Sequence, residues 1–218
     1  MRIEKDNLLD SILESIEKMD YVKSANIPNI DLYMDQVTTF MEKALSSSKR
    51  YPDDKILTKT MINNYAKDDL LPPPLKKKYS KEHLMILTFI YYFKNILSIK
   101  DIETLLTPIT QKHFHSENTL DISHIYDEVC AFKKERTRIL QDDIKKAYET
   151  SKKTFSEVET DDHAFLQFFS FICLLSLDVY VKKQIVEKLV DIIADEQKIN
   201  NPETKKESKK ESKKESKK

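Results

Sequence analysis

The chain has 218 residues, of which 34% are charged, with no glycine and a formal net charge of zero. Phosphate-cradling loops, dinucleotide fingerprints and nucleophile elbows all depend on glycine, so its absence argues against the common nucleotide enzymes and against tight two-residue hairpins. Helix-forming and charged residues dominate, which predicts an all-α protein with ample sequence for a core.

Charge is unevenly distributed along the chain. Residues 43–100 contain twelve Lys or Arg and five acidic residues, so the remainder is acidic. A basic segment of this kind predicts a surface patch that binds a polyanion. The alternative interpretation is a solvated, lysine-rich surface.

The first unit, residues 1–26, is predicted to be a support helix over residues 6–20. Its apolar stripe comprises Leu8, Ile12, Ile16 and Met19.

The acidic start lacks the layout of a signal peptide, and Cys130 and Cys173 are expected to be buried thiols in a reducing cytosol. We therefore expect a cytoplasmic protein.

A second helix is expected after Pro28, with Asn29 or Asp31 as its cap. Its predicted inner face consists of Tyr33, Val37, Phe40, Met41 and Ala44. The connection that follows carries three candidates for contact with a nucleic-acid backbone, namely Lys49, Arg50 and Lys55.

The third helix is predicted over residues 58–70, with Thr58 as its cap. Its buried stripe consists of Met61, Ile62 and Tyr65, and its opposite face of Lys59, Thr60, Asn63 and Lys67. Three prolines, Pro72–Pro74, end it because they remove backbone donors and bias the preceding residue out of the helical region.

A basic link, Lys76–Lys78, leads to Tyr79 and the next helix. Ser80 is the predicted cap of a helix that runs to about Leu97. Ser98 with Asp101 forms a capping-box pattern for a further helix over residues 99–106.

The order of these parts resembles the DNA-binding head of MerR-type winged helix-turn-helix regulators. The residues that carry the resemblance are Leu57-Thr58, Ile62, Tyr65, Leu70-Leu71-Pro72-Pro73, Tyr79-Ser80-Lys81-Glu82-His83-Leu84, Ser98-Ile99-Lys100-Asp101-Ile102 and Leu105-Leu106. The chain as a whole, including Leu32-Tyr33-Met34-Asp35-Gln36-Val37 and Met61-Ile62-Asn63-Asn64-Tyr65, is similar to an uncharacterised bacterial family, domain of unknown function 1836.

The resemblance implies a head over residues 27–110 that binds double-stranded DNA. Its recognition helix would use Thr58, Lys59, Thr60, Asn63, Asn64 and Lys67, and its phosphate contacts would be Lys76, Lys77, Lys78 and Tyr79. The resemblance also implies a homodimer joined by the C-terminal helices, and it leaves any small-molecule effector unidentified.

The chain departs from the MerR-type pattern at several positions. Asn63 stands where an arginine is usual, Asn64 where an aromatic residue is usual, and Asp69 where a glycine usually precedes the Leu-Leu-Pro-Pro segment. Residues 72–79 are too few for two paired strands and a loop, which predicts a reduced wing.

The region after Pro108 is expected to be irregular as far as Asn118. His113, His115 and His124 are candidates for a metal cluster, but they offer no fixed set of ligands. Solvent-facing histidines, and no metal or other cofactor, are therefore expected.

The C-terminal unit, residues 119–198, is predicted to be an antiparallel hairpin of two long helices, residues 120–153 and 161–198. Its most apolar stretch, Ala164–Val181, contains Gln167, Ser170, Ser176 and Asp178, which favours a core helix over a membrane span. The Lys-Lys-Glu-Ser repeats within residues 199–218 predict a disordered tail.

Two functions follow from these observations. The first is a sequence-specific transcriptional regulator, and the alternative is a helical interaction module whose degenerate head no longer binds DNA. No enzymatic activity is expected, because the acidic pairs Asp142-Asp143 and Asp161-Asp162 are sequence neighbours that do not share a helix face, and no nucleophile has a recognisable catalytic setting.

Overall fold

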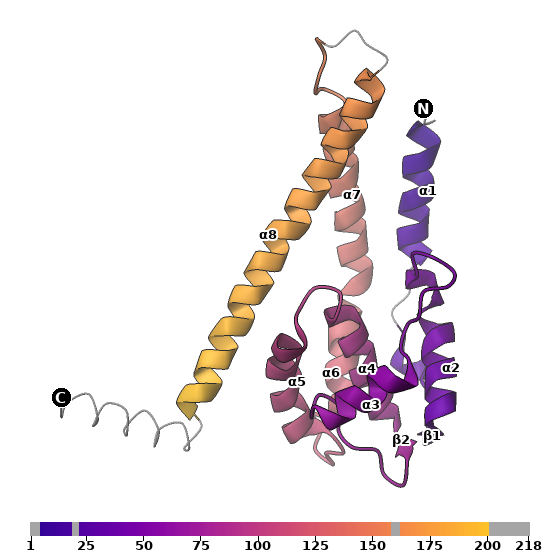
Figure 1. Cartoon of the computed structure of the whole chain (residues 1–218), viewed down its shortest axis with the longest axis vertical. Coiled ribbons are helices and arrows are strands. Elements are labelled where there is room, and N and C mark those ends of the chain that lie inside the picture. The colour runs from indigo at the N-terminus through magenta and orange to yellow at the C-terminus, as the bar shows by residue number, and fades with distance from the viewer. Residues whose placement is uncertain (1–4, 19–21, 158–161, 201–218) are drawn as a thin grey trace, which may run out of the picture.

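The computed structural model describes residues 5–18, 22–157 and 162–200 (Figure 1). The helices are α1 (Lys5–Lys18), α2 (Met34–Ala44), α3 (Lys59–Lys67), α4 (Lys81–Phe93), α5 (Ile99–His113), α6 (Ile122–Ala131), α7 (Lys133–Ser151) and α8 (His163–Asn200), with short 3-10 turns at Ser24–Asn26 and Ser46–Ser48. Two strands, β1 (Leu32–Tyr33) and β2 (Lys78–Tyr79), form a small antiparallel sheet. The predicted all-α class is confirmed.

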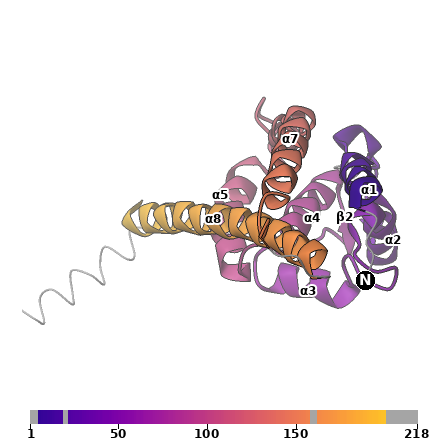
Figure 2. The same cartoon turned by 90° about the horizontal axis from the view of Figure 1, so that it is seen from above.

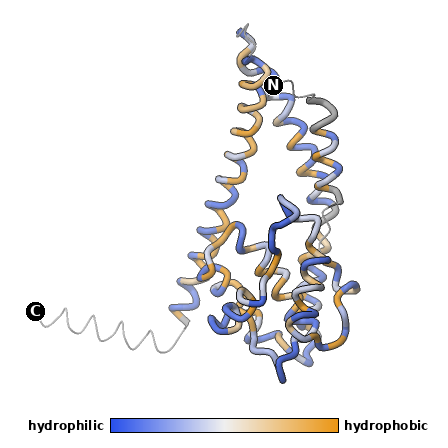
Figure 3. The backbone as a smooth tube through the Cα atoms, turned by 45° about the vertical axis from the view of Figure 1, so that its right-hand side comes forward, coloured by the Kyte–Doolittle hydropathy of each residue, from blue (hydrophilic) through white to orange (hydrophobic). Residues whose placement is uncertain are grey.

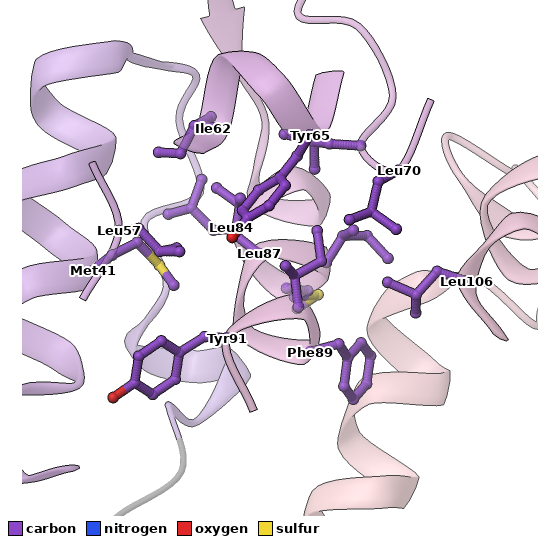
Figure 4. Close-up of a cluster of buried hydrophobic side chains, with 14 of the residues drawn as sticks. Met41, Leu57, Ile62, Tyr65, Leu70, Leu84, Leu87, Phe89, Tyr91 and Leu106 are labelled. Carbon is purple, nitrogen blue, oxygen red and sulfur yellow. The ribbon is translucent and has the colours of Figure 1, made fainter. Parts of the chain in front are cut away.

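Helix α4 forms the centre of the core. Every residue from His83 to Tyr91 is buried, as expected of a helix that is covered on all sides. Helices α2, α5 and α6 contact it, and α3 adds Ile62 and Tyr65 to the same cluster (Figure 4). Helices α2, α3, α5 and α6 are therefore positioned by their packing around the apolar helix α4.

Local capping signals determine where most helices begin. Thr58 Oγ1 accepts a hydrogen bond from the Met61 N–H at 3.2 Å, as predicted. Ser98 and Asp101 form the predicted reciprocal box, with the Ser98 N–H donating to Asp101 Oδ2 at 3.0 Å and the Asp101 N–H donating to Ser98 Oγ at 3.2 Å. Helix α4 ends at Phe93, short of the predicted Leu97. In the turn that follows, the N–H groups of Ile96 and Leu97 both donate to the Phe93 carbonyl, each at 2.8 Å.

The second helix starts later than predicted. Tyr33 occupies its cap position in place of Asn29 or Asp31, and the Tyr33 N–H donates to Gln36 Oε1 at 2.9 Å. Val37 and Met41 are buried as expected. Tyr33 is exposed, because its side chain lies on the face of β1 opposite to that of the buried Leu32.

Helix α5 continues through Pro108, so the predicted irregular segment after that proline is wrong over its first part. Pro108 has no N–H for the Thr104 carbonyl, which would otherwise lack its helical partner. Gln197 Nε2 of α8 donates to that carbonyl at 2.9 Å. A residue far along the chain thus replaces the hydrogen bond that the proline removes.

The C-terminal helices form the predicted antiparallel hairpin, with one difference. The helix expected over residues 120–153 is divided at Phe132 into α6 and α7. Helices α7 and α8 run in opposite directions (Figure 1) and pack through Tyr148 and Phe171, whose ring centroids are 5.3 Å apart. The C-terminal half of α8 crosses to α5 (Figures 1 and 2).

Helix α8 is not the buried core helix that the sequence predicted. Only 6% of its most apolar 18-residue window is buried, and Cys173, predicted to be buried, is exposed. Apolar residues line its upper half in Figure 3. Within the described ranges, α8 is the helix whose length and composition would suffice to cross a membrane.

Helix α1 confirms the predicted N-terminal helix but turns a different side inward. Leu13 is buried and Ile12 is exposed, since α1 packs on α7, where Gln141 Nε2 donates to the Leu13 carbonyl at 3.3 Å. Met19 and the tail from residue 201 lie outside the described residues.

Candidate nucleic-acid interface

Helix α3 presents a polar face to solvent. Ile62 and Tyr65 are buried against the core, and burial raises the pKa of the Tyr65 hydroxyl. The residues on the outward face are exposed, namely Lys59, Thr60, Asn63, Asn64 and Lys67. Thr58 is half-buried because its hydroxyl caps the helix. The predicted recognition-helix residues are thus accessible, apart from the capping threonine.

The end of α3 is fixed by a left-handed residue. Asp69 has a φ of 56°, and the N–H groups of Leu70 and Leu71 both donate to the Tyr65 carbonyl, at 2.9 and 3.0 Å. This is a Schellman-type ending, whose left-handed position usually holds glycine. Asp69 therefore occupies the position at which the resemblance expects a glycine, and it adds an exposed negative charge beside α3.

The basic link forms a tight two-residue turn, which contradicts the prediction that the chain lacks such hairpins. Lys76 and Lys77 have φ values of 50° and 63°, and the Lys78 N–H donates to the Leu75 carbonyl at 2.9 Å. Both central residues are left-handed, as in a type I′ turn. Each costs about 1–2 kcal/mol in that conformation because neither is glycine. The turn exposes both lysines at its tip.

Strand pairing places Lys78 and Tyr79, the two residues that follow this turn, on opposite faces of the small sheet. Leu32 pairs with Tyr79, and Tyr33 pairs with Lys78. Because neighbouring side chains of a strand point to opposite faces, Tyr79 enters the core and Lys78 lies outward, with its Nζ 5.1 Å from the Tyr33 ring centroid. Tyr79 is only 3% exposed, so its expected phosphate contact is wrong.

The start of α3 and the lysine turn lie at the same end of the head. Lys59 forms an ion pair with Asp35 at the start of α2, and Lys78 lies over Tyr33, two residues before Asp35. The Lys59–Asp35 pair could not be predicted from sequence spacing, since it joins separate helices. This pair reduces the free positive charge of α3.

Polar contacts with Glu42 of α2 hold the connection between α2 and α3 in place. Lys49 forms an ion pair and hydrogen bond with its carboxylate, which lowers the pKa of Glu42, and the Ile56 N–H donates to the same group at 3.5 Å. Arg50 lies over the Tyr51 ring at 5.2 Å. Of the three basic candidates, Arg50 and Lys55 are exposed, while Lys49 is paired with Glu42 of α2.

The histidines near the end of α5 hold neighbouring segments together. His115 Nδ1 lies 2.7 Å from Glu82 Oε2, and the His115 N–H donates to the same oxygen at 2.9 Å. His113, in the last turn of α5, has its Nδ1 2.8 Å from the Leu120 carbonyl oxygen. Among the described residues, no group of three or more His, Cys, Asp or Glu could hold a metal ion.

His83 anchors the first turn of α4 from within the core. The Ser80 N–H donates to its Nδ1 at 2.9 Å, so His83 fills the place that Glu or Gln takes in an ordinary capping box. Burial, with a smaller contribution from the charge of His115, lowers the pKa of His83 to about 4. The imidazole is therefore neutral near pH 7.

The geometry defines a predominantly helical head that exposes one short polar helix and one basic turn. Residues 22–129 match the sequence model of the family described as Domain of unknown function (DUF1836). No curated protein matches the chain, and no solved structure does so.

Proposed function

We propose that this protein is a sequence-specific DNA-binding regulator whose head is similar to that of MerR-type proteins. Helix α3 would enter the major groove, where Asn63 or Asn64 would contact base edges, since an asparagine amide can form two hydrogen bonds with adenine. Lys76 and Lys77 would contact phosphates beside the groove and fix the register of the helix.

One observation carries the proposal. The polar face of α3 and the lysine turn are both exposed, and the contacts of Lys59 with Asp35 and of Lys78 with Tyr33 hold them at one end of the head. In such an arrangement the helix can contact base edges in the groove while the basic turn contacts the neighbouring phosphates.

Two copies joined through their C-terminal helices would present two heads to one duplex, as in the regulators that the head resembles. Such a protein would act in the cytoplasm.

The acidic groups around α3 favour the second candidate, a protein-interaction module. Asp35 neutralises Lys59, and Asp68 and Asp69 are exposed at the other end of the helix. A surface that carries both acidic and basic side chains would be complementary to a protein partner that also carries charges of both signs.

Selection of duplexes from a random pool by the full chain separates the two candidates. We expect an enriched motif, and we expect the Asn63→Ala variant to lose discrimination at one base pair, by about 1–3 kcal/mol. Asn118→Ala is the matched control, because Asn118 is exposed in the loop between α5 and α6. Recovery of unenriched sequences by the wild-type protein would reject the regulator.

A further inference from the structure

The amino-terminal half of α8 has the composition of a membrane segment, and it is exposed (Figure 3). The most apolar 18-residue window of the helix has a mean hydropathy of 1.9, and only 6% of that window is buried. A buried core helix and a signal sequence near the amino terminus can have the same composition. The low burial excludes the first explanation, and a start at His163 excludes the second. The described part of the chain therefore leaves this apolar surface without a covering.

The open face of α8 is wider than one partner helix would bury. Helix α7 covers one side, where the rings of Phe171 and Tyr148 are 5.3 Å apart. A helix that packs on one neighbour has an apolar stripe of about 100°. Fluid lipid can cover a wider face than that. At 100° per residue, the exposed apolar residues of this half extend over roughly 200° of the circumference. They are Phe165, Phe169, Ile172, Cys173, Leu177, Val179, Tyr180 and Val181.

Charged residues lie outside this open face. Asp178 is the one charged residue within Ala164–Val181, and it follows Phe171 by two helical turns, so it stands on the side of α7. Lys182 and Lys183 come directly after the apolar stretch, next to the exposed Tyr180. Tyrosine and lysine at the end of an apolar segment suit the headgroup region of a bilayer, because their polar tips can reach the lipid phosphates.

The packing of α7 selects an α8 that lies parallel to the bilayer surface. The outer surface of α7 is charged, with exposed Asp142, Asp143, Lys145, Lys146 and Glu149. Since charged side chains are costly in hydrocarbon, α8 cannot span a bilayer while α7 remains packed on it. The C-terminal half of α8 is also held to the head, where Gln197 Nε2 donates to the Thr104 carbonyl at 2.9 Å. A parallel α8 keeps both contacts and buries its open face by about 5–10 Å.

We propose that the amino-terminal half of α8 docks on a lipid bilayer, parallel to its surface, through the face centred on Cys173 and Leu177. This face is opposite to the α7 contact at Phe171. It is also more than a quarter of a turn from Val190, which packs the other half of α8 into the core of the head. The docking does not rest on the proposed function, because neither α3 nor the lysine turn takes part in it.

Tryptophan fluorescence in the full chain tests the face and its depth, because the sequence contains no tryptophan. The single variants Phe169→Trp, Cys173→Trp and Tyr180→Trp place the probe along the face. Tyr51→Trp is the matched control, since Tyr51 and Tyr180 are 57% and 60% exposed. On phosphatidylcholine vesicles we expect a blue shift in the three α8 variants and none in the control. Lipids brominated in the upper part of their acyl chains should quench the three probes equally.

Flotation with the same vesicles, at low and at high salt, measures the binding itself. Phosphatidylcholine has no net charge, so the basic residues of the head and of the C-terminal repeats contribute little at high salt. We expect the wild-type chain to float at both salt concentrations. Leu177→Glu should bind more weakly by about tenfold or more. Leu75→Glu, which changes an exposed leucine of the lysine turn, should bind like the wild type.

Four results would overturn the proposal. A wild-type chain that does not float would reject docking on lipid, and equal losses in Leu177→Glu and Leu75→Glu would reject α8 as the contact. A blue-shifted Cys173→Trp in the absence of vesicles would show that protein covers the face. Strongest quenching of Cys173→Trp by lipids brominated deep in the bilayer, with weaker quenching at Phe169→Trp and Tyr180→Trp, would show a spanning helix.

Discussion

Lowering the pH from 7.5 to 5 is expected to destabilise the head through His83. The pKa of this buried imidazole is about 4 in the folded protein, against an ordinary value of 6.5. The unfolded chain therefore binds the extra proton in this interval while the folded chain does not, so the free energy of unfolding falls as the pH falls below 6.5 and the loss is complete below pH 4. The loss amounts to about 2 kcal/mol at pH 5 and about 3 kcal/mol at pH 4.

The physical cause is the position of His83 in the first turn of α4. Protonation places a hydrogen on Nδ1, which then cannot accept from the Ser80 N–H, and it creates a charge inside the core. The nearby charges of His115 and Asp31 act in opposite directions on the pKa of His83, so burial dominates.

Urea unfolding followed by circular dichroism at pH 7.5 and pH 5 measures this effect. The matched variant is His83→Asn, whose Oδ1 can accept from Ser80 but does not titrate in this range. The wild-type protein should lose about 2 kcal/mol more than the variant between the two pH values. An equal loss in both proteins would refute the reasoning, since the other titrating groups are common to both.

Further predictions concern α3 and the lysine turn. Thr58→Ala should lower the free energy of unfolding by about 1 kcal/mol through loss of the cap, and Ile62→Ala should lower it by about 2–5 kcal/mol. Asn63→Ala should change it by less than about 0.5 kcal/mol. Urea titration measures all three values, and a large loss in Asn63→Ala would contradict the exposed position of Asn63. Glycine at both Lys76 and Lys77 should raise the free energy of unfolding, by about 1 kcal/mol or more, because glycine adopts left-handed angles without strain. The same double variant should bind DNA more weakly, and a loss of stability would contradict the turn geometry.

Features that depend on neighbouring residues could be predicted from the sequence. The Thr58 cap and the Ser98–Asp101 box join residues three positions apart, so the sequence already contains both partners. The outward position of Asn63 likewise follows from helical periodicity around Ile62.

Features that depend on distant residues could not be predicted in this way. Pro108 suggested a helix end, but Gln197 supplies a donor to the Thr104 carbonyl from α8. Tyr79 followed three lysines and suggested a surface position, but pairing with Leu32 turns it into the core. Both outcomes require the tertiary arrangement to be known first.

The exposure of α8 was also hidden in the sequence. An apolar stretch of that length normally marks a buried helix, and only the arrangement of α7 and α8 shows that one side lacks a partner within the described part of the chain.

The proposed function is tested most directly by the salt dependence of binding to the selected duplex. Each phosphate contact adds about 0.9 to the slope of the logarithm of affinity against the logarithm of salt concentration. The variant with alanine at Lys76 and Lys77 should therefore lose about 2 from this slope. Alanine at Lys145 and Lys146, an exposed pair of the same charge on α7, should leave the slope unchanged. Equal slopes for the wild-type protein and the Lys76–Lys77 variant, or no binding to any duplex, would contradict the account.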